Sequence, residues 1–144
     1  MKIFIDGSAG TTGLRIKDRL MKRSDVELTT LSEEQRKDTE SRKQALNSAQ
    51  VAFLCLPDAA AVEAVELVEN PDTVIIDTST AHRTSEGWAY GFPELSAEFE
   101  NKIKNSKRIA VPGCHAGGFI ALVYPLVEAG VLGNDALLSC YSLT

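Results

Sequence analysis

Hydrophobic residues along the chain gather in short runs that alternate with longer stretches of helical spacing. Strands are predicted at residues 2–6, 26–31, 50–56, 73–77 and 109–111. Helices are predicted between the first strand and residue 21, more weakly at 41–49, and again at 58–68 and 116–129. Because strands and helices alternate, the pattern predicts an α/β fold with a doubly wound, mostly parallel sheet. Ligands of such sheets bind at the carboxyl ends of the strands.

Other segments are less regular. Residues 32–40 are expected to form a charged polar loop, and residues 81–93 an ordered surface loop near the ligand-binding edge. Asp58 follows Pro57 and is expected to cap the third helix. Residues 136–144 have the composition of another strand, which we expect to be the first strand of a second sheet.

Composition and charge narrow the class of protein. With 144 residues, 44% of them hydrophobic and 24% charged, the chain can bury one sizeable core. No apolar run approaches the roughly 20 residues of a membrane-spanning helix, and the first residues lack the pattern of a signal peptide. The formal net charge of -5, without a basic block, does not favour nucleic acid as a partner. These features predict a cytoplasmic protein that binds neither membranes nor nucleic acids.

The cysteines do not suggest a metal site or a disulfide. Their positions, Cys55, Cys114 and Cys140, match neither the spacing of a metal knuckle nor a disulfide framework. Reduced thiols and no bound metal are therefore expected. Cys55 and Cys140 lie in predicted apolar strands, where a cysteine is usually a small buried hydrophobic residue.

A glycine-rich loop joins the first predicted strand to the first predicted helix. Its sequence, Gly7-Ser8-Ala9-Gly10-Thr11-Thr12-Gly13, has the pattern G-x-x-G-x-x-G. Glycines at such a turn let the backbone approach a pyrophosphate, which the free amides at the helix N-terminus then bind. The position favours a Rossmann-like dinucleotide site over a plain turn, although the spacing differs from G-x-G-x-x-G.

The end of the second predicted strand bears on the choice of dinucleotide. An Asp or Glu at this place would bind the ribose hydroxyls of NAD, but the sequence has Ser32 there, with Arg36 and Lys37 following. Ser32 and Arg36 are suited to a 2'-phosphate, so the pattern favours NADP. Glu33 remains an alternative as a ribose ligand of NAD.

The segment Val111-Pro112-Gly113-Cys114-His115 lies between a predicted strand and a predicted helix. A cysteine near a helix N-terminus is biased toward the thiolate, and the same amides stabilise an oxyanion. Cys114 is therefore the predicted nucleophile. Adjacent residues of a helix do not face each other, so His115 is not expected to act as its base. His82, after the fourth strand, either faces this site or is an ordinary loop histidine.

Motifs along the whole chain together resemble one enzyme family. They are the loop Gly7 to Gly13, the run Asp77-Thr78-Ser79-Thr80-Ala81-His82-Arg83, the run Tyr90-Gly91-Phe92-Pro93-Glu94-Leu95, and Pro112-Gly113-Cys114-His115-Ala116. In this order they resemble the short class of N-acetyl-gamma-glutamyl-phosphate reductases of arginine biosynthesis.

The resemblance implies a reaction and a role for several residues. Cys114 would attack an acyl phosphate, and NADPH would reduce the resulting thioester to a semialdehyde. Ser79 would belong to the wall that faces the cofactor, and Arg83 and His115 would lie near the substrate.

The resemblance also implies a domain division. Residues 1–113 would form the NADP-binding domain, and residues 114–144 would begin a catalytic and dimerisation domain. In this family an acid/base histidine belongs to that second domain, and the full-length enzyme is expected to be a homo-oligomer. This chain alone is therefore expected to bind NADP but to turn substrate over poorly.

Three alternative functions would account for part of the pattern. Aspartate-semialdehyde dehydrogenase shares the fold plan and the thioester chemistry, but the PGCHAG and YGFPEL segments argue against it. A non-catalytic dinucleotide-binding module, with an inert Cys114, would also carry the glycine loop. A cysteine hydrolase is the weakest alternative because it leaves that loop unexplained.

Overall fold

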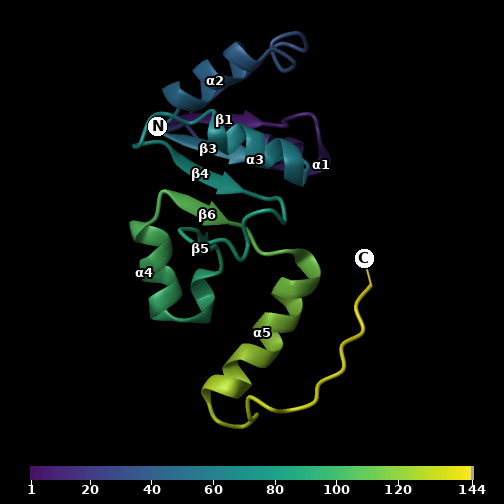
Figure 1. Ribbon diagram of the computed structural model, residues 1–144. Coiled ribbons are helices and arrows are strands. Elements are labelled where there is room, and N and C mark those ends of the chain that lie inside the picture. The colour runs from purple at the N-terminus through teal and green to yellow at the C-terminus, as the bar shows by residue number, and fades with distance from the viewer. Residues whose placement is uncertain (144) are drawn as a thin grey trace.

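The computed structural model describes residues 1–143 and has a parallel sheet of 6 strands at its centre (Figure 1). The strands are β1 (Lys2–Asp6), β2 (Glu27–Thr29), β3 (Val51–Leu54), β4 (Val74–Asp77), β5 (Ala89–Tyr90) and β6 (Arg108–Ala110). Their order in the sheet is β2-β1-β3-β4-β6-β5, and every neighbouring pair is parallel. The predicted α/β class and the parallel sheet are thereby confirmed.

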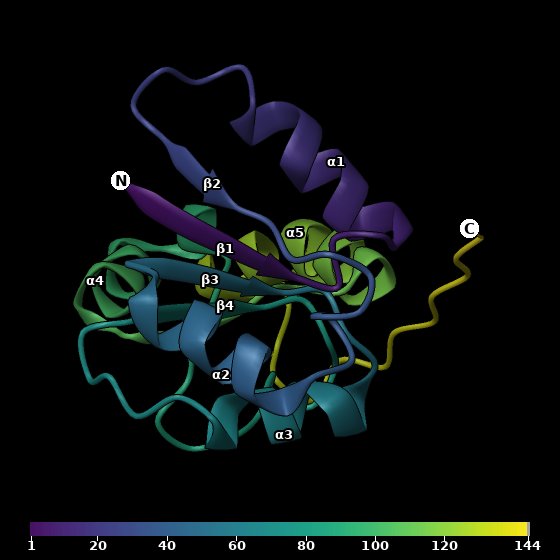
Figure 2. The same ribbon diagram turned by 90° about the horizontal axis from the view of Figure 1, so that it is seen from above.

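Helices cover both faces of this sheet. They are α1 (Thr11–Leu20), α2 (Thr39–Ser48), α3 (Asp58–Glu66), α4 (Ala97–Asn105), α5 (Cys114–Glu128) and the short 3-10 helix η1 (Pro93–Leu95). Seen from above, α1 lies on one side of β1 and β3, and α2 and α3 lie on the other (Figure 2). This placement of helices on both faces is the doubly wound arrangement expected from the alternation of elements.

The main core lies between the sheet and helices α2 and α3. Phe4, Ala52 and Ile75 are neighbours in register across β1, β3 and β4, and each is almost completely buried. Leu46 of α2 and Ala61 of α3 belong to the same buried cluster. Burying a large apolar side chain contributes about 1.5–3 kcal/mol. The core therefore holds the central strands in register and fixes where their carboxyl ends lie.

The chain changes direction across the sheet between β1 and β3. From β1 it passes to β2 on one side and then crosses to β3 on the other side of β1. The crevice outside such a switch point is where open α/β sheets bind their ligands. In Figure 1 the carboxyl ends of the strands point to the right, and α1 and α5 both start at that edge.

Two elements of the structure were not predicted from the sequence. Helix α4 has only Phe99 and Ile103 as large apolar residues, so its apolar stripe is narrow. It has other helix signals, namely the N-cap Ser96, which accepts a hydrogen bond from the Phe99 amide, and ion pairs four residues apart such as Glu98–Lys102. The segment 81–93 is also not wholly a loop, because it contains the short edge strand β5.

Two further expectations were wrong. Residues 136–143 form no strand, and residue 144, the end of that prediction, lies outside the described residues. A strand needs a partner for its backbone groups, and within residues 1–143 none pairs with this segment. Asp58 does not cap α3 but is its first residue, after the N-cap Pro57. Its carboxylate instead accepts hydrogen bonds from the amide and hydroxyl of Thr80.

Helix α5 differs from the other helices because it projects away from the sheet (Figure 1). Its side chains are mostly apolar, yet all of its residues are half-buried or exposed. One contact with α4 is the edge-to-face pair of Phe99 and Tyr124, whose ring centroids lie 5.9 Å apart. Among the described residues, no helix is both long and apolar enough to cross a membrane.

Candidate functional site

Gly7 sets the shape of the glycine loop where the chain leaves β1. Its φ of +83° is in the left-handed region, which a side chain disfavours. A Cβ at this position would also lie 2.2 Å from the carbonyl oxygen of Cys55. The Gly10 amide then donates to the Gly7 carbonyl over 3.1 Å and closes the turn. Glycine is therefore required at position 7 by both backbone conformation and space.

The loop leads directly into α1. Gly13 is buried, and a Cβ there would lie 2.4 Å from the Gly7 carbonyl oxygen, so the helix begins in close contact with the loop. By contrast, Gly10, Thr11 and Thr12 are exposed at the helix N-terminus. The first amides of a helix lack intrahelical acceptors and are suited to a phosphate. The loop therefore fits the pyrophosphate of a dinucleotide.

An ion pair links the carboxyl end of β1 to α2, and it was not predicted from the sequence. Nε and Nη2 of Arg42 donate to one carboxylate oxygen of Asp6, at 3.0 and 2.8 Å, and the Asp6 side chain is 4% exposed. A carboxylate this buried needs a partner. Arg42 therefore fixes the residue that directly precedes the glycine loop.

The predicted 2'-phosphate residues lie together in one turn after β2. The Ser32 hydroxyl accepts from the Gln35 amide over 3.2 Å, while the Gln35 side chain accepts from the Ser32 amide over 3.0 Å. The amide of Arg36 donates to the Ser32 carbonyl over 3.0 Å. Ser32 is exposed and Arg36 is half-buried. The guanidinium of Arg36 also donates to the Ser32 carbonyl over 3.4 Å, so both side chains belong to one turn, and their role as phosphate ligands remains a prediction.

A buried network follows β4. Asp77 is fully buried and its carboxylate accepts from the amide and hydroxyl of Ser79, at 2.9 and 2.6 Å. It also lies 2.7 Å from Nδ1 of His82, whose ring stacks on Trp88 with centroids 4.1 Å apart. His82 is therefore neither an exposed loop residue nor free to face a ligand through Nδ1. The Ser79 hydroxyl is likewise occupied by Asp77.

Arg83 connects the ends of β4 and β6. Its Nη2 donates to the Thr78 carbonyl over 3.2 Å, and its Nε donates to the Val111 carbonyl over 3.0 Å. Nη1 lies against Gly113, where a Cβ would be only 2.6 Å away. The guanidinium thus packs directly on the turn that carries Cys114.

Cys114 is the first residue of α5, and Gly113 is the N-cap. Its side chain is exposed, so the thiol is both accessible and beside the free amides of the first helical turn. The helix starts two residues earlier than predicted, which brings the thiol closer to those amides. Cys140 is exposed rather than buried, against expectation, because its segment forms no strand.

Cys55 has a different environment at the end of β3. Its thiol is half-buried, and burial raises its pKa. A hydrogen bond with Thr78 acts against this rise in pKa, while the charges of Asp6 and Asp77 add to it. Burial therefore disfavours the thiolate form of Cys55.

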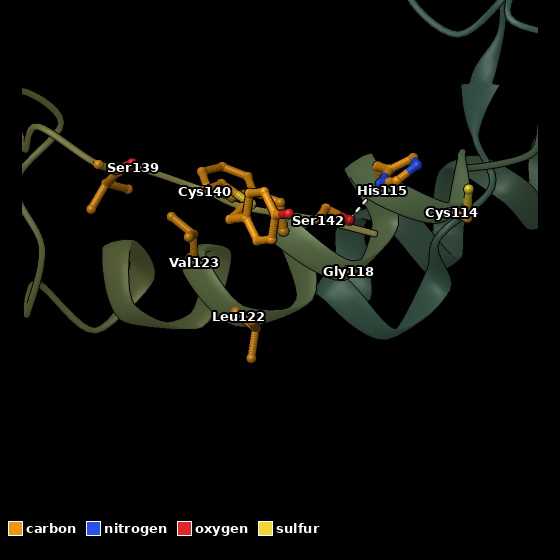
Figure 3. Close-up of a pocket in the computed structure, with 11 residues that line it drawn as sticks. Cys114, His115, Gly118, Leu122, Val123, Ser139, Cys140 and Ser142 are labelled. Atoms are coloured by element: carbon orange, nitrogen blue, oxygen red, sulfur yellow. Dashed lines mark hydrogen bonds between the residues drawn. The ribbon is translucent and has the colours of Figure 1, made fainter. Parts of the chain in front are cut away.

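Beside Cys114 an open cleft of about 440 Å³ lies between α5 and residues 138–142. Figure 3 shows the His115 ring directed toward Ser142, whose hydroxyl is its hydrogen-bond partner. The cleft is lined by Phe119 and Leu122 of the helix as well as by Cys114 and His115. His115 thus lies on the rim of this cleft and is engaged by Ser142 rather than by the neighbouring thiol.

Backbone hydrogen bonds assemble these segments into one edge. The Cys55 amide donates to the Asp6 carbonyl, the Thr78 amide to the Leu54 carbonyl, and the Val111 amide to the Asp77 carbonyl, at 2.8 to 3.0 Å. The glycine loop, the residues after β4 and the Cys114 turn are therefore held along adjacent strands. Within residues 1–143, no group of three or more His, Cys, Asp or Glu side chains is arranged to hold a metal ion.

Sequence comparisons relate this chain to a known family. Residues 2–105 match the family described as semialdehyde dehydrogenase, NAD binding domain. N-acetyl-gamma-glutamyl-phosphate reductase 2 of Pseudomonas putida is 51% identical over 99% of this chain and 45% of its own length. The N-acetyl-gamma-glutamyl-phosphate reductase of a Chelativorans species is 54% identical over 93% of this chain and 43% of its own length. The chain thus spans less than half the length of these curated relatives.

Solved structures share the fold at lower sequence identity. The aspartate semialdehyde dehydrogenase of Francisella tularensis superposes with a TM-score of 0.67 at 18% identity, covering 90% of this chain and 41% of the other. The Candida albicans enzyme, solved with NADP, gives 0.62 at 19% identity over 88% and 46%. These structures support the fold alone. The relatives with 51% and 54% sequence identity are named N-acetyl-gamma-glutamyl-phosphate reductases. The alternative of an aspartate-semialdehyde dehydrogenase is therefore not better supported.

Replacing Gly7 with alanine is expected to lower the free energy of unfolding by at least about 2 kcal/mol, because a side chain there meets both strain and the Cys55 carbonyl. Gly10→Ala is the matched control, since its φ is -76° and a Cβ would have 3.6 Å of clearance. It should change stability by less than about 1 kcal/mol. Urea unfolding followed by circular dichroism measures both, and equal losses would contradict this account of the loop.

Proposed function

Because the chain belongs to the semialdehyde dehydrogenase family, we propose that it is the cofactor-binding part of an NADPH-dependent N-acetyl-gamma-glutamyl-phosphate reductase. The observation that carries this proposal is the position of Cys114. An accessible thiol stands on the first residue of α5, at the same sheet edge as a glycine loop suited to a pyrophosphate. Thioester reduction requires a nucleophile and a dinucleotide that act at one site.

Cys114 is the proposed nucleophile of the forward reaction. Its thiolate attacks the acyl carbon of the acyl phosphate and forms a C–S bond, while the C–O bond to phosphate breaks and inorganic phosphate leaves. The glycine loop would hold NADPH, which would supply the hydride for reduction of the acyl group to the semialdehyde; the Cys114 thiolate would then be released as the C–S bond breaks. The amides of the first turn of α5 support both the thiolate and the oxyanion of the attacked carbonyl.

The proposed cofactor is NADP, held by the loop from Gly7 to Gly13. Ser32 and Arg36 would bind the 2'-phosphate, because they stand together in the turn after β2 where an acidic residue would select NAD. Glu33, in the same turn, is the competing choice as a ribose ligand. The segment around Ser79 would form the cofactor-facing wall through its backbone, since the hydroxyl of Ser79 is bonded to Asp77.

The proposed substrate contacts come from Arg83 and His115. Nη1 of Arg83 lies on the Gly113 side of the guanidinium, beside the Cys114 turn. His115 lines the cleft next to Cys114. A cation and a hydrogen-bonding ring are suited to the phosphate and the N-acetyl amide of N-acetyl-gamma-glutamyl phosphate.

Residues 114–144 are proposed to begin the catalytic and dimerisation domain. The exposed, apolar side chains of α5 support this, because such a helix is stabilised by packing against further chain. That domain would supply the acid/base histidine and the contacts of a homo-oligomer. The proposed location is the cytoplasm, where thiols stay reduced.

Arg36→Gln is expected to weaken NADP binding by roughly tenfold and to leave NAD binding unchanged, because it removes only the charge beside the 2'-phosphate. Isothermal titration with both dinucleotides measures the change, and Glu33→Gln is the matched variant in the same turn. If Glu33→Gln weakens NAD binding and Arg36→Gln has no effect on NADP, the ribose role of Glu33 is correct instead.

The chain incubated with N-acetyl-gamma-glutamyl phosphate, without NADPH, is expected to acquire one acyl group on Cys114. Intact-mass spectrometry and peptide mapping would show it, and thiol release by hydroxylamine would identify the thioester. Cys114→Ala should remain unmodified, whereas Cys140→Ala, which removes the other exposed thiol, should be acylated like the parent chain.

The same assay separates the alternatives. No acylation at Cys114 above that at Cys140 would favour a non-catalytic dinucleotide-binding module. Faster acylation by β-aspartyl phosphate than by the N-acetylglutamyl compound would favour an aspartate-semialdehyde dehydrogenase. Rapid NADPH formation from NADP, phosphate and the semialdehyde would contradict the need for a second-domain histidine.

A further inference from the structure

We propose that Arg83 is a positioning residue, which holds the turn before α5 so that Cys114 stands on the first residue of the helix. This inference rests on the proposed function of Cys114 and adds a task for Arg83 that comes before any contact with substrate. The task follows from where each nitrogen of the guanidinium lies.

Two of the three guanidinium nitrogens are bonded to the protein backbone. Nε donates to the Val111 carbonyl at the end of β6, and Nη2 donates to the Thr78 carbonyl just after β4. These carbonyls lie one residue beyond the ends of neighbouring parallel strands, which are also joined here by the bond from the Val111 amide to the Asp77 carbonyl. A planar guanidinium can span both acceptors at once, whereas a lysine ammonium on a flexible stem cannot reproduce this fork.

The third nitrogen explains the glycine before the cysteine. Gly113 has φ -75° and ψ 153°, a conformation open to any residue, so its backbone does not require glycine. A Cβ at this position would lie 2.6 Å from Nη1 of Arg83 and 3.2 Å from Cζ. The space that a side chain would need is therefore taken by the guanidinium. The packing of Arg83 against Gly113 therefore supports the turn.

The residues next to Arg83 hold its backbone in place. His82 is buried, with Nδ1 2.7 Å from the carboxylate of Asp77 and its ring stacked on Trp88. Asp77 also accepts from the amide and hydroxyl of Ser79. The segment that presents Arg83 is thus anchored to the end of β4, so the guanidinium is set before any ligand arrives.

The same two strands offer a matched control at their other end. Nη1 of Arg108 donates to the carbonyls of Thr73 and Lys107, at 3.0 and 3.1 Å, where β4 and β6 begin. Arg108 therefore makes a comparable link between β4 and β6 at the opposite edge of the sheet from Cys114. General loosening of the β4–β6 pair would follow from changes at either arginine, whereas loss of the Cys114 turn would follow only from changes at Arg83.

The experiment compares Arg83→Gln, Arg83→Lys, Gly113→Ala, the double variant Arg83→Gln/Gly113→Ala and Arg108→Gln. The first readout is the rate of Cys114 alkylation by iodoacetamide between pH 6 and 9.5, followed by peptide mass spectrometry with Cys140 as the exposed reference. Iodoacetamide carries no phosphate and no charge, so it reports on the thiol and not on substrate binding. The second readout is hydrogen exchange at the Gly117 amide, which makes the first backbone bond of α5, to Gly113.

Arg83→Gln, Arg83→Lys and Gly113→Ala are each expected to slow Cys114 alkylation at pH 7 roughly fivefold, to move its pH profile upward, and to speed exchange at Gly117. The double variant should be no slower than either single variant, because both changes remove the same contact. Arg108→Gln should leave alkylation within about twofold of the parent chain. Gly113→Ala leaves the Arg83 side chain unchanged in sequence, so it tests the positioning role even if the Arg83 variants fold poorly.

Three results would overturn the proposal. Parent-like alkylation in Arg83→Lys would mean that only the charge matters. An equal loss in Arg108→Gln would mean that the effect is general loosening. Unchanged exchange at Gly117 in Gly113→Ala would mean that the guanidinium does not hold the turn. A different result separates the two proposals. If Cys114 of the parent chain reacts no faster than Cys140, but exchange at Gly117 changes in the variants as expected, Arg83 positions the turn and Cys114 is not an activated nucleophile.

Discussion

The site depends on the parallel alignment of β1, β3, β4 and β6, which brings the carboxyl ends of these strands to one edge of the sheet. The core between the sheet and helices α2 and α3 fixes the register, and backbone hydrogen bonds then link each strand end to the next. The glycine loop and Cys114 lie more than a hundred positions apart in the sequence. Parallel pairing is what makes them parts of one edge.

Two arginines secure this edge where the regular pairing stops. Arg42 neutralises the buried Asp6 in front of the glycine loop, and Arg83 joins the ends of β4 and β6 in front of Cys114. Removing one partner of a buried ion pair costs about 3–5 kcal/mol, because the other charge is left without compensation. The buried Asp77 has a comparable role, since it holds the segment that carries Arg83. The edge is therefore shaped before any ligand binds.

Much of this arrangement is predictable from local signals. The apolar runs predicted the main strands, the glycine loop marked the start of α1, and the Pro112-Gly113 turn predicted a thiol near a helix start. Contacts between distant residues were not predictable, as Arg42 lies 36 positions from Asp6 and Arg83 lies 28 from Val111. Helix α4 was missed because its apolar stripe is narrow, and the strand at 136–144 was wrongly predicted because composition says nothing about whether a partner strand is present.

The most direct test is whether bound NADP affects both the glycine loop and the Cys114 turn. Titrating NADP into the 15N-labelled chain and following its amide resonances would show this. The resonances of the loop from Gly7 to Gly13, of the segment after β4 and of the Cys114 turn are expected to shift together, with one common dissociation constant. Shifts confined to the glycine loop, with the Cys114 turn unaffected at saturation, would contradict this expectation.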